Sequence, residues 1–304
     1  MRLGKPAPTA VPPLDDDRFE RALYLHMAAL MVVEETYTSA DKLMDAVLKH
    51  EEHFWTPTGA GSERRDRLWN NDVRRVVTAL TLRGGARKAE TETLVKNVGL
   101  TKGVRDEPEL LALLMHDLYP GNATEGVEPP LHVAGLEPDL LGEAMVRKAL
   151  RQEDQSEAPK FLKQALEGAE ASSIQNAFDV PGRISAEHAK EARPWIQSVL
   201  DQDVPGRALA ALSAAKSVGR TTAHAVLGEE LAKALERKGT VELAKQIEKG
   251  SWEEKTGIPF ATVSSREVND WALRAQLAAL PKSEHEDVLK ERARLLTANA
   301  ATAW

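Results

Sequence analysis

The segment of residues 118–150 constrains the fold of this chain more than any other stretch. It reads LYPGNATEGVEPPLHVAGLEPDLLGEAMVRKAL. The Tyr-Pro-Gly triplet near its start is typical of a helix end, and Pro138 followed by Asp139 is typical of the start of another helix. Between them lies an arm whose apolar residues Val127, Leu131 and Val133 follow a strand-like rhythm. This order is the outline of a winged-helix module.

Length and composition favour two helical units. A chain of 304 residues is about twice the size of a typical domain, and its 42% of apolar residues can supply a core for each unit. Aromatic residues make up only 5%, while alanine and leucine recur at helical spacing, which favours packing of helix on helix. We therefore expect an all-α protein with a linker over residues 1–17, a helical plus winged-helix domain over residues 18–152, and a solenoid-like α-helical domain over residues 153–304.

The first unit is expected to open with a pair of helices. Apolar residues recur at helical spacing from Phe19 to Val33, and a second helix is predicted to begin near Ser39. The apolar face of this second helix carries Leu43, Val47 and Phe54. Because a short connection joins the two helices, we expect them to pack as a hairpin.

Three further helices are predicted between this pair and the arm. One covers residues 64–82 and ends at Gly84 and Gly85, and a shorter one covers residues 87–95. The third starts around Pro108, with acidic residues in its first turn. Its leucines are expected to face the core, namely Leu110, Leu111, Leu114 and Leu118.

Beyond Gln152 the pattern changes to amphipathic helices separated by short turns. Helix breaks are predicted near Pro181-Gly182, Pro205-Gly206, Gly219, Gly239, Gly257-Ile258-Pro259 and Pro281. Alanine-leucine phrases such as FLKQALEGA and LAKALERKG recur, but their spacing is not fixed and no tetratricopeptide signature is present. We therefore expect an array of repeat-like helical hairpins.

The sequence lacks the patterns that most enzyme classes require. The absence of cysteine excludes disulfides, a thiolate nucleophile and a cysteine-ligated zinc site. The phosphate-binding patterns GxxxxGK[ST] and GxGxxG and the nucleophile pattern GxSxG do not occur. We therefore predict no enzymatic activity, no cofactor and no metal.

The segment of residues 50–53 contains residue types that can bind a metal. His50, Glu51, Glu52 and His53 are consecutive, but the histidines are three residues apart, whereas the zinc-protease pattern places them four apart. A metal site also needs a further ligand, and no other histidine cluster lies nearby. We therefore interpret this segment as the solvated face of a helix. A metal-dependent hydrolase that uses Glu51 or Glu52 is kept as an alternative hypothesis for the function.

A winged helix also raises the alternative of a DNA-binding transcriptional regulator. Residues 87–96 are the candidate recognition helix, in which Arg87, Lys88 and Lys96 are diluted by acidic residues. The other basic cluster consists of Arg64, Arg65, Arg67, Arg74 and Arg75. Because the net charge is −7 and the pI is near 5.7, nucleic acid is not the expected partner.

Two tryptophans are candidates for contact with a protein partner. Trp252 lies in a stretch with broken helical periodicity, and Trp304 is the last residue. We also expect a cytoplasmic, soluble protein without a membrane segment, because no run approaches ~20 apolar residues and the start lacks the apolar core of a signal peptide.

Three phrases together resemble a known family: FERALYLHMAAL at residues 19–30, LMDAVLKHEEHFW at 43–55 and LEPDLLGEAMV at 136–146. Their order and spacing are similar to the region downstream of the ATPase core in bacterial STAND proteins, the NACHT-like signalling NTPases. The resemblance implies a helical domain, a winged helix and a second helical domain, which in that family usually precede tetratricopeptide repeats. The last helices, SSREVNDWALRAQLAALP and LKERARLLTANAATAW, fit this order.

The resemblance also points to a nucleotide-sensing position. Related NLR-type switches hold a nucleotide phosphate with a Met-His-Asp triplet at the end of the winged helix. Met115, His116 and Asp117 spell that triplet but precede the arm, whereas the family's triplet follows it. By position the counterpart is Glu137-Pro138-Asp139, in which Pro138 cannot make the contact of the histidine. Asp139 is therefore the candidate for cofactor binding, and its alternative role is that of an acid favouring a helix N-terminus.

The resemblance implies a regulatory region without the ATPase core that it normally follows. We therefore expect a non-enzymatic regulatory or scaffold module that acts through protein–protein contacts. Its partner would be an NTPase domain encoded in cis or separately. Three origins remain open: a fragment of a longer protein, a protein acting in trans on a separate NTPase, and an independent interaction module.

Overall fold

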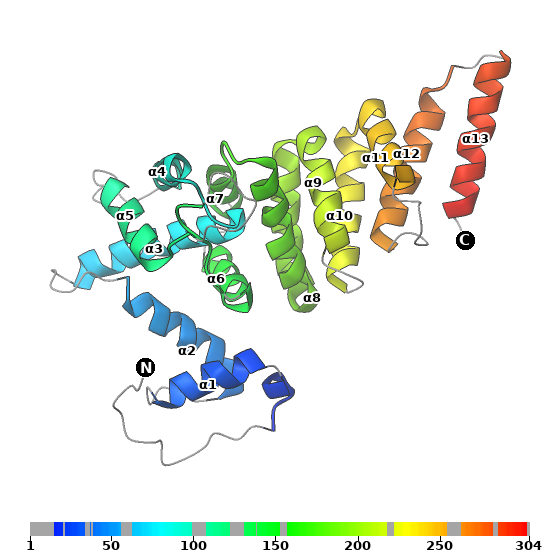
Figure 1. Cartoon of the computed structure of the whole chain (residues 1–304). Helices are drawn as coiled ribbons and strands as arrows, with labels where there is room; N and C mark the ends of the chain where they lie inside the picture. Colours follow the sequence, from blue (N-terminus) through cyan, green and yellow to red (C-terminus); the bar gives the residue numbers. More distant parts are fainter. Residues whose placement is uncertain are drawn as a thin grey trace.

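The computed structural model is all-α in the residues that it describes (Figure 1). These residues are 15–20, 22–33, 37, 39–55, 63–98, 108–121, 131–137, 139–152, 157–217, 222–253, 263–281 and 285–302. They form thirteen α-helices and one short 3-10 helix, η1 (Asp17–Glu20). The all-α prediction is confirmed. Among the described residues, no helix is both long and apolar enough to cross a lipid bilayer.

The N-terminal pair consists of α1 (Ala22–Val33) and α2 (Ala40–His53), which pack against each other. Ser39 has an extended backbone directly before α2, so the predicted helix start is confirmed. The α1 side chains of Met27 and Met31 and the α2 side chain of Leu43 are buried. Phe54 does not join this core: it follows α2 and is more than half exposed.

The next helix, α3 (Glu63–Arg83), ends at the predicted glycine stop. Gly84 and Gly85 have φ angles of 74° and 108°, a region that favours glycine because a side chain is strained there. The Gly85 amide donates a hydrogen bond of 2.8 Å to the carbonyl of Leu80, which satisfies one of the last acceptors of the helix. The chain continues into α4 (Lys88–Asn97) and α5 (Pro108–Leu118).

The arm after α5 forms no strand within the described residues. It makes two isolated antiparallel bridges, which pair Val133 with Ala86 and with Pro120. The Ala86 amide donates to the Val133 carbonyl at 2.8 Å, and the Ala134 amide donates to the Tyr119 carbonyl at 2.9 Å. The predicted strand-like rhythm is therefore reduced to single bridges around the buried Val133. Val127 lies outside the described residues.

Gly121 allows the arm to approach the end of α5 closely. A Cβ atom at this position would lie 2.0 Å from the carbonyl oxygen of Leu131 and 2.9 Å from the carbonyl carbon of His132. Both are backbone atoms, which cannot turn away as the end of a side chain can. A glycine is therefore required where the arm returns past Pro120.

The arm is followed by α6 (Asp139–Gln152), α7 (Glu157–Ala165) and α8 (Ala171–Gln202). Two polar side chains, the buried Arg83 and the partly buried Asn176, join α3 to α7 and α8. The Arg83 guanidinium donates to the carbonyls of Ala165 and Glu167, at the C-terminal end of α7, at 2.5 and 2.6 Å. Asn176 Nδ2 of α8 donates to the carbonyl of Thr81 at 2.9 Å. Both contacts satisfy carbonyls at helix ends.

The remaining helices follow in an array (Figure 1): α9 (Val204–Ser217), α10 (Thr222–Lys238), α11 (Val241–Glu253), α12 (Val263–Ala279) and α13 (Glu286–Thr302). Helix α10 packs against α8, α9 and α12, and α12 also packs against α11 and α13. Buried side chains form one continuous cluster from Phe19 to Ala272. The division of the chain at residue 152 stays a prediction.

Some of the helix breaks predicted beyond Gln152 are confirmed, and others lie outside the described residues. Helices change at Asp203, next to Pro205, and at Gly239, and α12 ends before Pro281, as predicted. The breaks at Gly219 and at residues 257–259 lie outside the described residues.

The break at Pro181 and Gly182 is wrong, because α8 runs through both residues. Both are buried, so packing against neighbouring helices keeps the helix continuous where local propensity disfavours it. The interruption lies instead at His188, whose φ of −130° and ψ of 44° are not helical.

Candidate functional site

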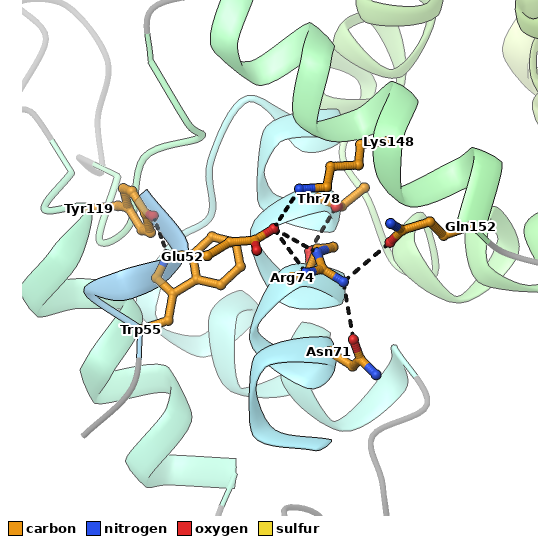
Figure 2. Close-up of polar contacts among 8 residues, drawn as sticks. All are labelled: Glu52, Trp55, Asn71, Arg74, Thr78, Tyr119, Lys148 and Gln152. Carbon is orange, nitrogen blue, oxygen red and sulfur yellow. Dashed lines mark hydrogen bonds and ion pairs between the residues drawn. The ribbon is translucent and has the colours of Figure 1, made fainter. Parts of the chain in front are cut away.

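Glu52 joins three helices of the N-terminal part (Figure 2). Its Oε1 accepts hydrogen bonds from Arg74 of α3, at 3.1 Å from Nε and 2.9 Å from Nη2, and from Lys148 Nζ of α6 at 3.0 Å. Arg74 Nη1 also donates to Asn71 at 3.1 Å and to Gln152 at 3.2 Å. The Glu52, Arg74 and Lys148 side chains are mostly buried. The network therefore fixes α2 against α3 and α6.

A second chain of hydrogen bonds ties α2 to the end of α5, and Figure 2 shows its contact between Trp55 and Tyr119. The indole Nε1 of the fully buried Trp55 donates to the Tyr119 hydroxyl at 2.8 Å. This hydroxyl in turn donates to Glu51 Oε1 at 2.7 Å. Burial, and then the neighbouring Glu51 carboxylate, raise the pKa of Tyr119 well above its ordinary value. The hydroxyl therefore remains a donor to Glu51.

The segment from His50 to His53 is consequently a structural junction more than a free ligand set. Glu51 and Glu52 are both engaged by other helices, and the rings of His50 and His53 contact Phe54 edge-on at 5.2 and 6.0 Å. In the part of the chain that the structure describes, no group of three or more histidine, aspartate or glutamate side chains is placed to hold a metal. Both glutamates thus have an account that needs no metal.

Asp139 lies at a small pocket between α3, α6 and α8. The pocket has a volume of about 90 Å³, and Thr81, Glu137, Asn176 and Val180 are among its lining residues. The Asp139 side chain is 77% exposed and lies 3.8 Å from Arg183 of α8. Asp139 is also the first residue of α6, where a negative charge favours the helix N-terminus.

The charges of this pocket favour a cation over an anion. Glu137, Asp139 and Glu143 contribute three carboxylates. The single arginine, Arg183, donates from Nε to Glu143 Oε1 at 2.5 Å. Burial raises the pKa of Glu143 above its ordinary value, and the Arg183 guanidinium opposes this shift. Sites for drug-sized ligands usually enclose ~300–1,000 Å³, so neither size nor charge suits a nucleotide phosphate here.

The three residues of the Met-His-Asp triplet lie within α5, and their side chains have different surroundings. Met115 is fully buried, His116 stacks on the His132 ring of the arm, and Asp117 is exposed. The three side chains therefore do not converge on one point, and none of them lines the Asp139 pocket.

Several of the basic residues singled out in the sequence make contacts with other residues of this chain. Arg75 Nε donates to the carbonyl of Val98 at 2.9 Å, and its guanidinium lies 4.7 Å from the centre of the Phe161 ring. Arg87 pairs with Glu170, before α8. The side chains of Arg64, Arg65 and Arg67 lie outside the described residues.

Among the described residues of the N-terminal part, the most exposed large apolar side chains lie on α5. Leu110 and Leu113 are each 55% exposed and lie one helical turn apart. Glu109 and Asp117 are exposed on the same helix, and α5 contains no lysine or arginine. We call these four residues the α5 face. The prediction that Leu110 faces the core is wrong, since Leu111, Ala112 and Met115 are the residues that α5 buries.

The two candidate tryptophans are not resolved as contact sites. Trp252 lies near the end of α11, within a helix and not in a break, and its side chain is outside the described residues. Trp304 also lies outside them. Of the other tryptophans, Trp55, Trp195 and Trp271 are buried in the core.

Comparison of the chain with protein-family models, with curated proteins and with solved structures gives no match. The resemblance to STAND proteins therefore stays a prediction.

Proposed function

We propose that this chain is a non-enzymatic regulatory or scaffold module that acts through protein–protein contacts. Its partner is an NTPase domain, carried in the same polypeptide or encoded separately, as in the STAND proteins that its sequence resembles. The module consists of a winged-helix-type unit followed by an array of repeat-like helical hairpins.

The order of elements supports the winged-helix part of the proposal. Helix α3 is followed by the bridging residue Ala86, then by α4 and α5, and then by the bridging residues Pro120 and Val133. A winged helix has the same order, in which the last extended segment pairs both with the segment directly after the third helix and with a short one after the first. Here the pairing consists of single bridges.

The α5 face is the observation that carries the proposal. In this order the third helix, which enters the major groove in DNA-binding relatives of the fold, is α5 and not α4, the helix of the candidate recognition segment 87–96. Base-reading helices present arginine, lysine, asparagine or glutamine, and the sequence of α5, PELLALLMHDL, contains none of them. It presents Leu110 and Leu113 between two acidic side chains, a surface suited to an apolar protein surface with a basic rim.

This proposal predicts that the protein does not bind DNA by phosphate contacts. Fluorescence anisotropy with a labelled random duplex should show binding no tighter than ~10 µM even at ~50 mM salt, because the α5 face is acidic. Submicromolar binding that weakens steeply with salt would instead support the transcriptional regulator. The matched control is the double variant Lys88→Glu and Lys96→Glu, which reverses two exposed cations of α4.

The proposal also predicts no measurable affinity for ATP. The sequence has no phosphate-binding loop, and the pocket at Asp139 is small and lined by carboxylates. Titration calorimetry with Mg-ATP up to ~1 mM should give only heats of dilution, and no hydrolysis should be detected, since a nucleotide pocket is usually several times larger. A dissociation constant in the micromolar range would contradict the proposal.

A further inference from the structure

Two histidines lie face to face where the arm meets α5. His116 belongs to the last turn of α5, and His132 lies on the arm beside Val133. Their ring centres are 4.0 Å apart and the ring planes differ by only 10°. His116 Nδ1 also lies 2.8 Å from the carbonyl oxygen of His132, to which it can donate a hydrogen bond. Ring stacking and this hydrogen bond hold the same two residues together.

The backbone of His132 and its neighbours attaches the arm to the rest of the molecule. The amides of His132 and Val133 donate to the Ala86 carbonyl at 2.9 and 3.0 Å, and the Gly121 amide donates to the His132 carbonyl at 3.0 Å. The Ala134 amide completes the attachment by donating to the carbonyl of Tyr119. The residue whose ring stacks on His116 is therefore also one whose backbone seats the arm.

Protonation works against this arrangement. Two imidazolium rings at this separation repel each other, so the stack favours a state in which at least one ring is neutral. Lys88 of α4 also acts on His132 with the same sign as His116, and Glu92 of α4 acts with the opposite sign. Burial, followed by the charges of His116 and Lys88, lowers the pKa of His132 below its ordinary value.

We propose that the stacked His116 and His132 form an acid-sensitive latch, which seats the arm on α5 at neutral pH and releases it in mild acid. The latch is built from the arm contacts alone, so it does not depend on the function proposed above. Release would change the surface at the end of α5 and leave the helices of the array in place.

The direction of the effect follows from the lowered pKa of His132. The seated arm binds fewer protons than the released arm, so its stabilisation is complete above the ordinary histidine pKa of about 6.5. As the pH falls from this value through the lower pKa of the seated state, the released arm takes up a proton and becomes relatively more stable.

The test is amide hydrogen exchange measured by NMR on the full chain, read at Val133 and Ala134 and corrected for the intrinsic pH dependence of exchange. We expect the protection factors of these amides to fall roughly tenfold between about pH 7.5 and about pH 5, while the core of α10 is unchanged. In His132→Phe, which keeps a flat ring without a titrating group, protection should vary less than about twofold over the same range. The control His26→Gln removes an exposed histidine of α1 and should respond as the unmodified chain does.

Two results would overturn the latch. One is arm protection that does not change with pH in the unmodified chain, and the other is an equal loss of protection in His132→Phe. If His132→Phe fails to fold, the imidazole C2 proton of His132 in the unmodified chain decides the question. It should titrate below the ordinary histidine pKa of about 6.5, and titration at or above that value would contradict the proposal.

Discussion

Replacement of Trp55 by alanine is expected to lower the free energy of unfolding by about 3–5 kcal/mol. The indole is fully buried, so its removal leaves a large cavity between α2 and the end of α5. The substitution also removes the indole N–H that donates a hydrogen bond to the Tyr119 hydroxyl, which in turn donates to Glu51. Denaturant unfolding followed by circular dichroism measures the change.

Two control variants separate burial from hydrogen bonding at this position. Trp55→Phe keeps most of the apolar contact and should cost roughly 1–2 kcal/mol, because it removes the indole donor and leaves a smaller cavity. Phe54→Ala changes the exposed neighbour and should alter stability by less than about 0.5 kcal/mol. If Trp55→Ala cost no more than Phe54→Ala, Trp55 would not hold the junction between α2 and α5.

Replacement of Arg83 by alanine is expected to cost about 3 kcal/mol, the second largest effect. The guanidinium is buried and donates hydrogen bonds to the carbonyls of Ala165 and Glu167 at the end of α7, which lose this donor when the side chain is removed. Burial lowers the pKa of Arg83, so the two carbonyl contacts must offset the cost of desolvating its charge. Urea unfolding of the variant gives the value.

Arg87→Ala is the matched control for Arg83→Ala. Arg87 lies four residues later and also reaches the region after α7, where it pairs with Glu170 at the surface. Exposed ion pairs contribute between about 0 and 1 kcal/mol, so its loss should be small. Equal effects of the two substitutions would show that the buried contacts of Arg83 do not secure α7 to α3.

Local signals in the sequence were sufficient to predict several of the helices. Helical spacing predicted α2 and α3. The pair Gly84 and Gly85 predicted the end of α3, because glycine tolerates a positive φ wherever it stands in the sequence. The face of α5 could not be assigned in the same way. Leucines occupy both sides of this helix, so the period alone does not decide whether Leu110 or Leu111 is buried.

Contacts between distant residues account for most of what the sequence could not predict. Glu51 and Tyr119 are 68 residues apart, and Glu52 and Lys148 are 96 apart, so no local pattern pairs them. Without these partners, the segment from His50 to His53 resembles a ligand set or a solvated face. The wrong prediction of a break at Pro181 has the same cause, since tertiary packing of α8 overrides the local preference for a break.

The position of Asp139 illustrates the limit of a positional analogy. Its place after the arm, at the start of α6, was predicted from the sequence. The pocket beside it is set by Glu143 and by Arg183 of α8, and the sequence alone does not bring these residues together. The side chains around a position therefore decide its chemistry, and here the charged ones are three carboxylates and one arginine.

The most direct test of the central claim is a quantitative capture experiment on the α5 face. Immobilised protein is exposed to lysate of the native host, and retained proteins and nucleic acids are quantified for the unmodified chain and for the double variant Leu110→Glu and Leu113→Glu. Leu209→Glu, which changes a leucine of comparable exposure on α9, is the matched control. The proposal predicts that a protein, expected to carry a P-loop NTPase domain, is retained by the unmodified chain and by the control and is lost with the α5 variant. Equal retention by all three proteins, or retention of nucleic acid alone, would contradict it.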